Sequence, residues 1–531
     1  MLLRYRMHGV RHNRRHGVTL VETGDKARAM QSFPSPQMPR VLQWRWIVAI
    51  ALASALPFLF VRIPPLVDVP GHIGRFAVQL APADSVLHRY FSFTWRPTLN
   101  LGSDLIVQAL HPLMGPVAAM WLVCAAVPVL TVLGLLGVAR RLNPQGAAAL
   151  PWALILVYND SFLWGFVNYA LSAALALCGF AAWMAWDARP RLRALSFALF
   201  TPALFLAHGE GGALLVLLIA AFEAERVGPL RVKTLAARLW PLGFAAIPVL
   251  LARGEKGGAT LWDWPSKADA LFNLVRDQSL VFDVATALAI VAVLLIGWLC
   301  GARLVRPGAW AVWASLALFL VAPFQLSGTA NVDARLLAHA LMLALVLQDW
   351  RGTGARLRRG IMIVGAVLLV LRFAVTIGSF LGYGRDYARQ LAALDHISPG
   401  SRVLNLTLSD CGVRGWRQPR TTHLAALATA ERDAWVNVHW AVKAVHLLQV
   451  RYAPPGFAMD PSQIVYAPGC RGTTGTGNRR RGIAEVLPSL PLDQVDYLWL
   501  IDVALPPGPR DPRLVPVWRS GSSALYAVRR T

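Results

Sequence analysis

The sequence predicts a mainly α-helical protein, a polytopic membrane bundle of about 11 transmembrane helices with a small C-terminal extracytoplasmic α/β domain. Hydrophobic residues make up 56% of the 531 positions and charged residues only 15%, and the mean hydropathy is +0.48. This balance is too apolar for a water-soluble protein of such length. The apolar residues are also gathered in runs, and basic residues fill alternate segments between these runs.

Eleven apolar runs are candidates for membrane spans, for which roughly 17 to 25 residues is the usual length. They lie near residues 44–62, 113–138, 144–159, 163–186, 194–208, 210–225, 238–252, 282–302, 308–326, 334–350 and 360–382. The runs near 144–159, 194–208, 210–225 and 238–252 are short or contain a proline. One pair of them could be re-entrant without changing the side on which the chain finally emerges.

Loop charge orients these spans, because cytoplasmic loops are enriched in Lys and Arg. With the N-terminal tail in the cytoplasm, every loop expected on the cytoplasmic side is basic. These loops hold Arg140 and Arg141; Arg189, Arg191 and Arg193; Arg226, Arg231, Lys233 and Arg238; Arg303 and Arg306; and Arg351, Arg356, Arg358 and Arg359. The net charge of +24 is therefore interpreted as a set of orientation signals, and binding to nucleic acid is not expected.

The topology divides the chain into three parts. Residues 1–43 form a disordered basic cytoplasmic tail, residues 44–382 the membrane module with a long first outer loop at 63–112, and residues 383–531 an outer α/β domain. Within that domain we expect strands at 401–406, 497–501 and 524–528 and a helix over 422–450. The Arg- and Ala-rich composition suggests a bacterium, so we place the protein in the inner membrane with a periplasmic C-terminal domain.

Cysteine usage agrees with this placement. Cys124, Cys178 and Cys300 fall inside apolar spans, where they are interpreted as packing residues. Cys411 and Cys470 fall in the outer domain, where a disulfide between them is plausible.

The candidate catalytic stretch is 67–75, Val-Asp-Val-Pro-Gly-His-Ile-Gly-Arg, just after the first span. Pro70 suits the first turn of a helix, so Asp68, His72 and Arg75 would project from roughly one face. An acid, an imidazole and a guanidinium are thus brought together at a membrane surface. Intramembrane and interfacial ionisable groups are expensive, which makes them functional candidates.

Other polar residues fall at the outer ends of the spans. They are Asp160, His208, Glu210, Asp333 and Arg335. Asn168 lies one to two turns inside the fourth span, where its amide needs a partner; packing between helices is favoured over a ligand. Arg372 lies deep in the last span, and either snorkelling to an interface or binding of a lipid phosphate would explain it. The sequence has no phosphate-binding glycine loop, zinc spacing or nucleophile elbow in convincing context.

These residues resemble those of the GT-C superfamily, the polytopic glycosyltransferases that use polyprenyl-phosphate sugars. The pieces that carry the resemblance are 68–75, Asp-Val-Pro-Gly-His-Ile-Gly-Arg; 165–169, Gly-Phe-Val-Asn-Tyr; the outer His208; and 333–335, Asp-Ala-Arg. The pattern is similar to the protein mannosyltransferase and lipid A aminoarabinose transferase group. The resemblance implies transfer with inversion at the anomeric carbon, from a lipid-linked donor to a cell-envelope glycan, lipid or protein.

In such a reaction Asp68 would be the base that takes the acceptor proton, and Arg75 and Arg335 would hold the phosphate. His72 and His208 would be supporting donors, and Asn168 and Asp333 complete the binding candidates. Many GT-C enzymes carry paired acids in the first loop, whereas Asp68 stands alone, with Asp84 and Asp104 too distant along the chain. No cofactor is therefore assigned, and a divalent metal stays an open alternative.

Two other functions stay open at this point. A transporter or flippase of a lipid-linked substrate would also suit eleven spans with intramembrane charge. No inverted repeat is evident and the large first outer loop is unusual for a carrier, so the enzyme is preferred. A non-catalytic assembly partner that binds cell-envelope components is the third alternative.

Overall fold

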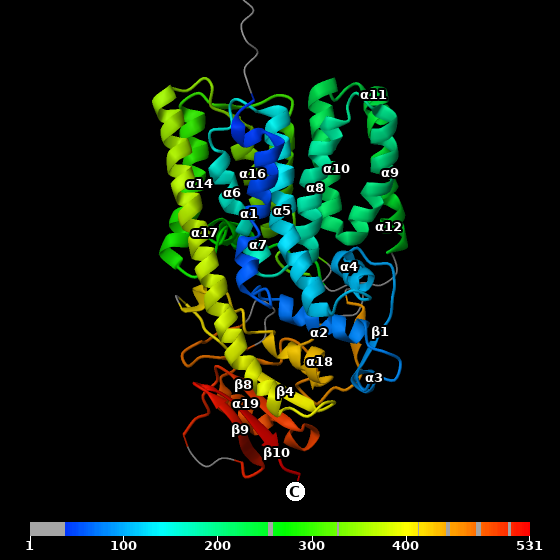
Figure 1. The fold of residues 1–531 in the computed structure, drawn as a ribbon, viewed down its shortest axis with the longest axis vertical. Coiled ribbons are helices and arrows are strands. Elements are labelled where there is room, and N and C mark those ends of the chain that lie inside the picture. Colours follow the sequence, from blue (N-terminus) through cyan, green and yellow to red (C-terminus); the bar gives the residue numbers. More distant parts are fainter. Residues whose placement is uncertain are drawn as a thin grey trace, which may run out of the picture. The chain divides into compact units, whose positions relative to one another are not determined.

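Each of the eleven apolar runs contains helix in the computed structural model, which describes residues 38–252, 259–326, 329–412, 414–441, 446–473, 479–507 and 511–530 (Figure 1). The helices are α1 (Trp44–Ala53) with η2 (Leu56–Phe60), α5 (Pro116–Leu142), α6 (Leu150–Ile155) with η3 (Leu156–Tyr158), α8 (Val167–Ala185), α9 (Pro190–Ala207), α10 (Gly209–Val227), α11 (Val232–Leu239) with α12 (Ala246–Leu251), α14 (Leu280–Leu299), α15 (Ala309–Val321), α16 (Val332–Leu347) and α17 (Ala355–Leu391).

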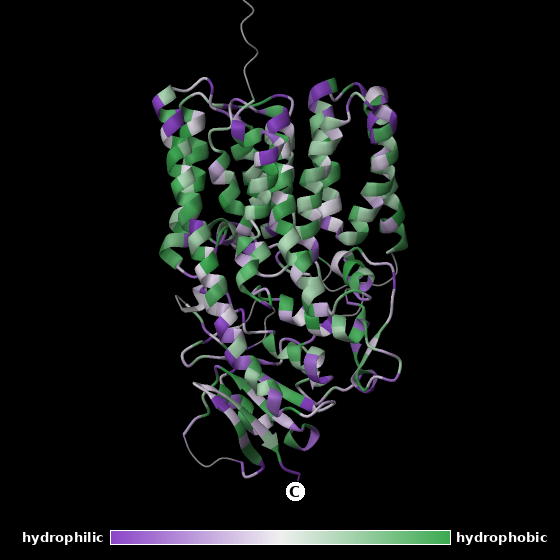
Figure 2. Cartoon of the chain, in the orientation of Figure 1, coloured by the Kyte–Doolittle hydropathy of each residue, from purple (hydrophilic) through white to green (hydrophobic). Residues whose placement is uncertain are grey.

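Five helical segments are long and apolar enough to cross a bilayer by length and composition. They are Pro116–Leu142, Val167–Ala185, Val232–Leu251, Leu280–Leu299 and Ala355–His396, and shorter apolar segments occur at Trp44–Phe60, Leu150–Leu163 and Ala309–Val321. Figure 2 shows the hydrophobic residues concentrated along these helices, with polar residues at their ends. The helices indicate a multi-pass membrane protein, whereas a count of eleven crossings stays a prediction.

The long loop 63–112, which the sequence predicts on the outer side, is folded. It contains α2 (Val69–Gln79), α3 (Leu87–Tyr90), β1 (Phe91–Phe93) and α4 (Gly102–Leu110). Strand β1 pairs in an antiparallel ladder with β6 (Leu448–Val450), so that Phe91 lies opposite Val450. The loop is therefore hydrogen-bonded to a strand more than 350 residues further along the chain.

A six-stranded mixed sheet forms the C-terminal region. Its central strand β4 (Arg402–Ser409) runs parallel to β8 (Tyr497–Ile501) on one side, and to β5 (Trp435–Val436) and β7 (Ile464–Tyr466) on the other. Strand β10 (Ser523–Val528) is antiparallel to both β8 and β9 (Leu514–Ser520). The three strands expected from the sequence are confirmed.

The helix expected over 422–450 is wrong for most of its length. Among the described residues of this stretch, η7 (Leu424–Ala426) and α18 (Leu427–Arg432) are helical, and β5 and β6 follow. Asp433 adopts a left-handed backbone with φ of 50°, which ends the helix. The buried segment after it then supplies a strand to the sheet, a tertiary contact that local pattern does not reveal.

The expected boundary between residues 382 and 383 falls inside α17, which has 37 residues and ends at Leu391. Helix α17 extends from the bundle to the sheet region (Figure 1). The division into three domains stays a prediction, and most of the expected tail, residues 1–37, lies outside the described residues. Residues 40–42 of that tail form a short 3₁₀ helix.

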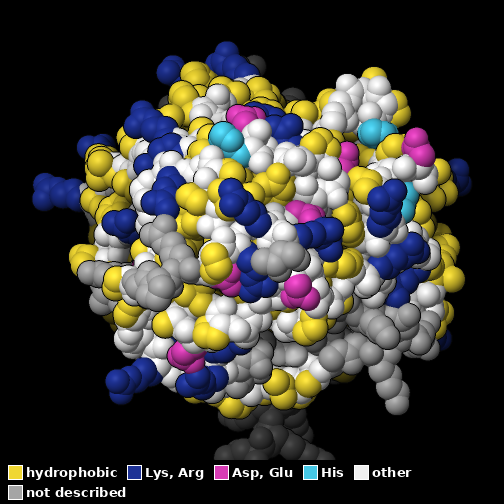
Figure 3. All heavy atoms as spheres, turned by 90° about the horizontal axis from the view of Figure 1, so that it is seen from below, with side chains coloured by type: hydrophobic (Ala, Val, Ile, Leu, Met, Phe, Trp, Pro, Cys, Tyr) yellow, Lys and Arg dark blue, Asp and Glu magenta, His cyan; other side chains and the backbone are white. Residues whose placement is uncertain are grey.

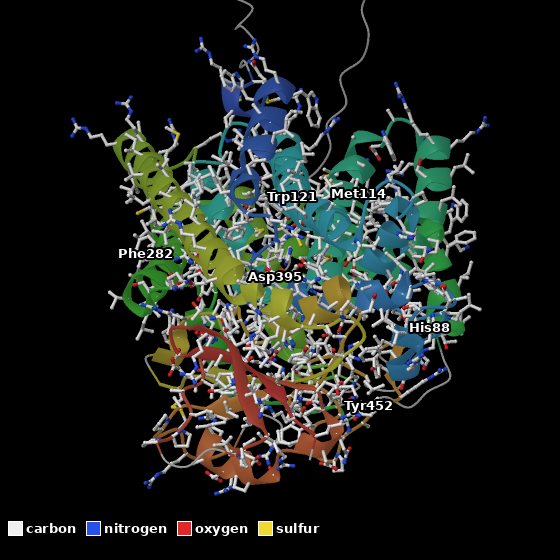
Figure 4. The ribbon with its side chains drawn as sticks, turned by 60° about the horizontal axis from the view of Figure 1, so that its bottom comes forward. His88, Met114, Trp121, Phe282, Asp395 and Tyr452 are labelled. Carbon is white, nitrogen blue, oxygen red and sulfur yellow. A yellow bond between two sulfur atoms is a disulfide. The ribbon has the colours of Figure 1, made fainter. Side chains whose placement is uncertain are left out.

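Buried ion pairs join the membrane helices to the start of the C-terminal region. Arg372 of α17 pairs with Asp283 of α14 rather than reaching an interface. Asp283 also accepts a hydrogen bond of 2.8 Å from the indole of Trp416. Close by, the guanidinium of Arg420 lies 2.7 Å from Asp277, and both side chains are fully buried. Figure 4 labels Asp395, which lies just beyond the end of α17.

The Arg420–Asp277 pair yields a stability prediction. Breaking a buried pair leaves an uncompensated charge, which typically costs about 3–5 kcal/mol. We expect Arg420→Met to lower the melting temperature of the detergent-solubilised protein clearly. Arg513→Met, which removes a partly exposed partner of Asp511, is the matched control and should leave the melting temperature almost unchanged. Equal melting temperatures for the two variants would contradict a stabilising role for the pair.

Candidate active site

A cavity of about 620 Å³ lies between one set of helix ends and the C-terminal region. Its walls come from the start of α2, the turn before α8, the α9–α10 junction, the start of α16, and the segments around residues 423, 440 and 461. Asp68, His72, Asn168, His208 and Arg335 all line it. The structure therefore brings together five of the seven candidate residues from four distant stretches of sequence.

Asp68 is placed by the N-terminus of α2. It is the N-cap residue, yet its side chain makes no capping hydrogen bond, so the carboxyl group remains available to the cavity. Its amide donates to the carbonyl of Trp164 at 3.0 Å. Gly165 follows with φ of +87°, and a Cβ there would lie 2.8 Å from the Asp68 nitrogen. Only glycine allows this approach, which fixes Asp68 against the turn before α8.

Two residues of the C-terminal region face Asp68. Nε2 of His423 lies 3.7 Å from Oδ1 of Asp68, and Nδ1 of the same ring lies 3.9 Å from Oδ1 of Asp460. The imidazole thus stands between two carboxyl groups that are 392 positions apart in the chain, numbered 68 and 460. The Asp68 side chain is 17% exposed and that of His423 only 7%.

Burial dominates the protonation of this group. It raises the pKa of Asp68 to about 8; the negative charge of Asp460 adds to the rise, and Arg335 opposes it. Burial lowers the pKa of His72, His423 and His446, so these rings are neutral near pH 7. A carboxyl group that titrates near the working pH is suited to general base catalysis.

Arg335 is the cation of the cavity. Among the described lining residues no other Lys or Arg side chain is present. Its guanidinium bonds Glu210 at 2.9 Å and the carbonyl of Ala330 at 2.9 Å, and it lies 4.2 Å above the Phe166 ring. These partners fix the side chain in place, and Glu210 offsets part of its charge.

Arg75 is not brought to the cavity. It is buried and forms a two-pronged ion pair with Asp104 of α4, one arm of which measures 3.1 Å. Its Nη2 also lies 3.5 Å from Nδ1 of His72. Arg75 therefore contacts the cavity only through His72. Asp104, which lies too far along the chain to form a local pair with Asp68, is the ion-pair partner of Arg75.

Asp333 is also absent from the cavity wall. It pairs with Lys267 at 2.9 Å, and that ammonium also donates to two backbone carbonyls. Asn168 lines the cavity but is engaged in packing: its oxygen accepts from the Ser103 amide at 2.6 Å, and its amide donates to Asn100. This supports the packing role favoured from the sequence.

His208 caps α10, accepting at Nδ1 from the Glu210 amide at 3.3 Å. Its ring lies edge-on to Tyr169, with 5.7 Å between centroids. Tyr169 in turn donates to the Arg335 carbonyl at 2.6 Å. His208 is therefore held in a chain of contacts that ends at Arg335, on the cavity wall.

The part of the chain that the structure describes has no group of three His, Cys, Asp or Glu side chains that could hold a metal ion. Cys411 and Cys470, the expected pair, are joined by a disulfide with Cα atoms 5.9 Å apart. The bond closes a loop that contains both His423 and Asp460.

Sequence reasoning missed the C-terminal wall of the cavity. His423, Trp440, His446 and Asp460 all line it, yet they lie in a stretch interpreted largely as a helix of the outer domain. A signal was present: three histidines and two tryptophans occur within 423–446 of a chain that has 12 histidines in all. Such a concentration of imidazoles beside apolar residues is more typical of a site than of a solvated helix.

The bundle of apolar helices indicates a polytopic membrane protein, with a cavity between the ends of its helices and the C-terminal region. Among solved structures, the chain is similar to the cryo-EM structure of arabinofuranosyltransferase AftD from Mycobacteria, with a TM-score of 0.50 and 18% sequence identity. The match covers 92% of this chain and 40% of the other, so this chain spans about two fifths of that protein. No protein-family model and no curated protein matches the sequence. At this identity the likeness concerns the fold alone.

The Asp68–His423–Asp460 arrangement yields a prediction that needs no substrate. Because the charge of Asp460 raises the pKa of Asp68, Asp460→Asn should lower that pKa below about 8. Infrared titration of the carbonyl band of the protonated carboxyl group measures this shift, and Asp68→Asn identifies the band by removing it. Asp511→Asn, far along the chain and partly exposed, is the control. An unshifted titration in Asp460→Asn would contradict the coupling.

Proposed function

We propose that the protein is an integral membrane glycosyltransferase that transfers a sugar from a polyprenyl-phosphate donor to a cell-envelope acceptor on the periplasmic face. One observation carries the proposal: a carboxyl group with a raised pKa and a fixed arginine share one cavity at the ends of apolar helices. The likeness of the fold to an arabinofuranosyltransferase supports the reaction class.

The chemistry needs a base and a site for the leaving phosphate. The acceptor oxygen attacks the anomeric carbon, its proton passes to the Asp68 carboxylate, and the bond between that carbon and the phosphate oxygen breaks. The phosphate leaves with its electron pair and additional negative charge, which Arg335 stabilises. Neutral imidazoles of His72 and His208 offer N–H donors to the same group. The resemblance to GT-C enzymes implies inversion at the anomeric carbon.

His423 and Asp460 adjust the base rather than replace it. Burial, with an added contribution from the charge of Asp460, keeps the pKa of Asp68 high, which makes the carboxylate a stronger proton acceptor once it is ionised. His423 lies between the two acids at 3.7 and 3.9 Å and separates their charges. Asp68, which has no paired acid near it in the first loop, thus has a second acid near it from the C-terminal region.

The proposal is tested by reconstituting the protein in liposomes with a labelled polyprenyl-phosphate sugar and following transfer and lipid translocation together. We expect Asp68→Asn to reduce transfer by at least about a hundredfold, the lower end of a general-base contribution. The variant keeps the size of the side chain, and its melting temperature reports on folding. Asp104→Asn, which disturbs Arg75 outside the cavity, is a comparison for indirect effects and should lose less.

Unchanged transfer in Asp68→Asn would reject Asp68 as the base. Translocation without any transfer by the wild-type protein would favour the flippase alternative. Neither transfer nor translocation would leave the assembly role as the surviving function.

The pH dependence of transfer provides an independent prediction. A base works as its carboxylate, and the fraction of Asp68 that is ionised rises with pH up to its pKa of about 8. We therefore expect kcat/KM to rise about tenfold per pH unit below that value and to level off above it. Asp460→Asn should move the rise to lower pH, and Arg335→Gln should move it to higher pH, because each partner biases the Asp68 pKa in that sense. A profile that is flat between pH 5 and 8 would rule out this role.

A further inference from the structure

A second cavity of about 490 Å³ adjoins the first on the side of the C-terminal region. Pro461, Ile464 and Tyr466 line both cavities, so a molecule in the second can extend into the first. The other lining residues include Ser462, Arg479 and Arg481. All lining residues fall between positions 456 and 481, and none comes from an apolar helix. We call this second cavity the arginine cleft.

The cleft is basic. Arg479 pairs with Glu485, which neutralises part of its charge. The exposed Arg481 has no acidic side chain within 4.0 Å among the residues that the structure describes. The guanidinium of Arg480 lies 5.4 Å from the Tyr466 ring and adds a third positive charge beside the cleft. Figure 3 shows the face of the C-terminal region, where Lys and Arg side chains are spread between few acids.

The walls of the cleft are held in place by the backbone. The amide of Tyr466 donates to the Arg481 carbonyl at 2.9 Å, and the amide of Arg480 donates to Gly472 at 3.0 Å. The amide of Ala467 donates to Ser409, at the end of β4, and the Cys411–Cys470 disulfide lies beside these bonds. The backbone at Arg481 is therefore hydrogen-bonded to β7. The residue after β7 is in turn hydrogen-bonded to Ser409 at the end of β4, which lines the first cavity.

We propose that the arginine cleft binds an anionic group, a carboxylate or phosphate, carried by the acceptor glycan whose hydroxyl reaches Asp68. The inference rests on the proposed function and names the acceptor class. Guanidinium groups favour carboxylate and phosphate because their paired N–H donors match two oxygens. The acceptor is favoured over the lipid-linked donor as the occupant, because the described lining of the cleft comes from the C-terminal region and not from the apolar helices along which a lipid chain would lie.

Binding of matched pairs of small probes tests the proposal without any transfer. The full-length protein in phosphatidylcholine nanodiscs is titrated with digalacturonic acid against its dimethyl ester, and with glycerol 3-phosphate against glycerol. We expect at least about tenfold tighter binding of the charged member of one pair, the size of a lost charge-assisted hydrogen bond. The pair that shows the difference tells whether the anion is a carboxylate or a phosphate.

Variants assign the difference to the cleft. Arg481→Gln should abolish the preference for the charged probe, and Arg481→Lys should retain most of it. Arg529→Gln removes the same charge from an exposed position outside the cleft and should leave the preference intact. Equal binding of charged and neutral probes by the wild-type protein, or equal loss in Arg481→Gln and Arg529→Gln, would overturn the proposal.

The two proposals fail separately. Asp68→Asn should retain the charge preference while transfer is lost, since Asp68 does not line the cleft. A charge preference in a protein without transferase activity would support the cleft and remove the proposed function. Transfer without a charge preference would remove the cleft alone.

Discussion

Helix α2 is in close backbone contact with the turn before α8 and with the C-terminal segment at Ala426, and each contact requires a glycine. At its start the Asp68 amide is bonded to the turn at Gly165, and on its next turns Gly74 faces the carbonyl of Ala426, which a Cβ would approach to 2.5 Å. No side chain could occupy either position without shifting α2 or its neighbour. Because the carboxyl group of Asp68, the neighbouring C-terminal segment and the turn before α8 meet here, the cavity exists only while α2 stays in both contacts.

The buried ion pairs also help to hold the cavity walls in place. Arg372 joins α17 to Asp283 of α14, while Arg420, in the segment that precedes His423, pairs with Asp277 and Trp416 bonds to Asp283. Removing one member of a buried ion pair leaves an uncompensated charge, which strongly destabilises the folded protein. The wall carrying His423 is therefore held by interactions that resist partial opening, whereas an apolar contact of the same area could slide.

The part of the fold predicted from sequence is the part governed by hydropathy and short-range pattern. Eleven helical stretches and three strands were located because their period and composition are local. The partners of the charged residues are not predicted in this way, because the ion pairs Arg75–Asp104 and Lys267–Asp333 depend on which helix faces which. His423 and Asp460 were missed for the same reason: nothing near Asp68 in the sequence indicates that residues 355 and 392 positions away will flank it.

The length of helix α17 fixes the position of the C-terminal sheet relative to the membrane. Its 37 residues make a rod of about 55 Å, against roughly 30 Å of hydrocarbon in a bilayer. Exposed apolar side chains mark its first part, from Met362 to Val375, and charged ones such as Arg385 and Arg389 follow. A stiff rod of fixed length sets the height of the sheet above the lipid, and with it the distance between the lipid surface and the part of the cavity wall that the C-terminal region supplies.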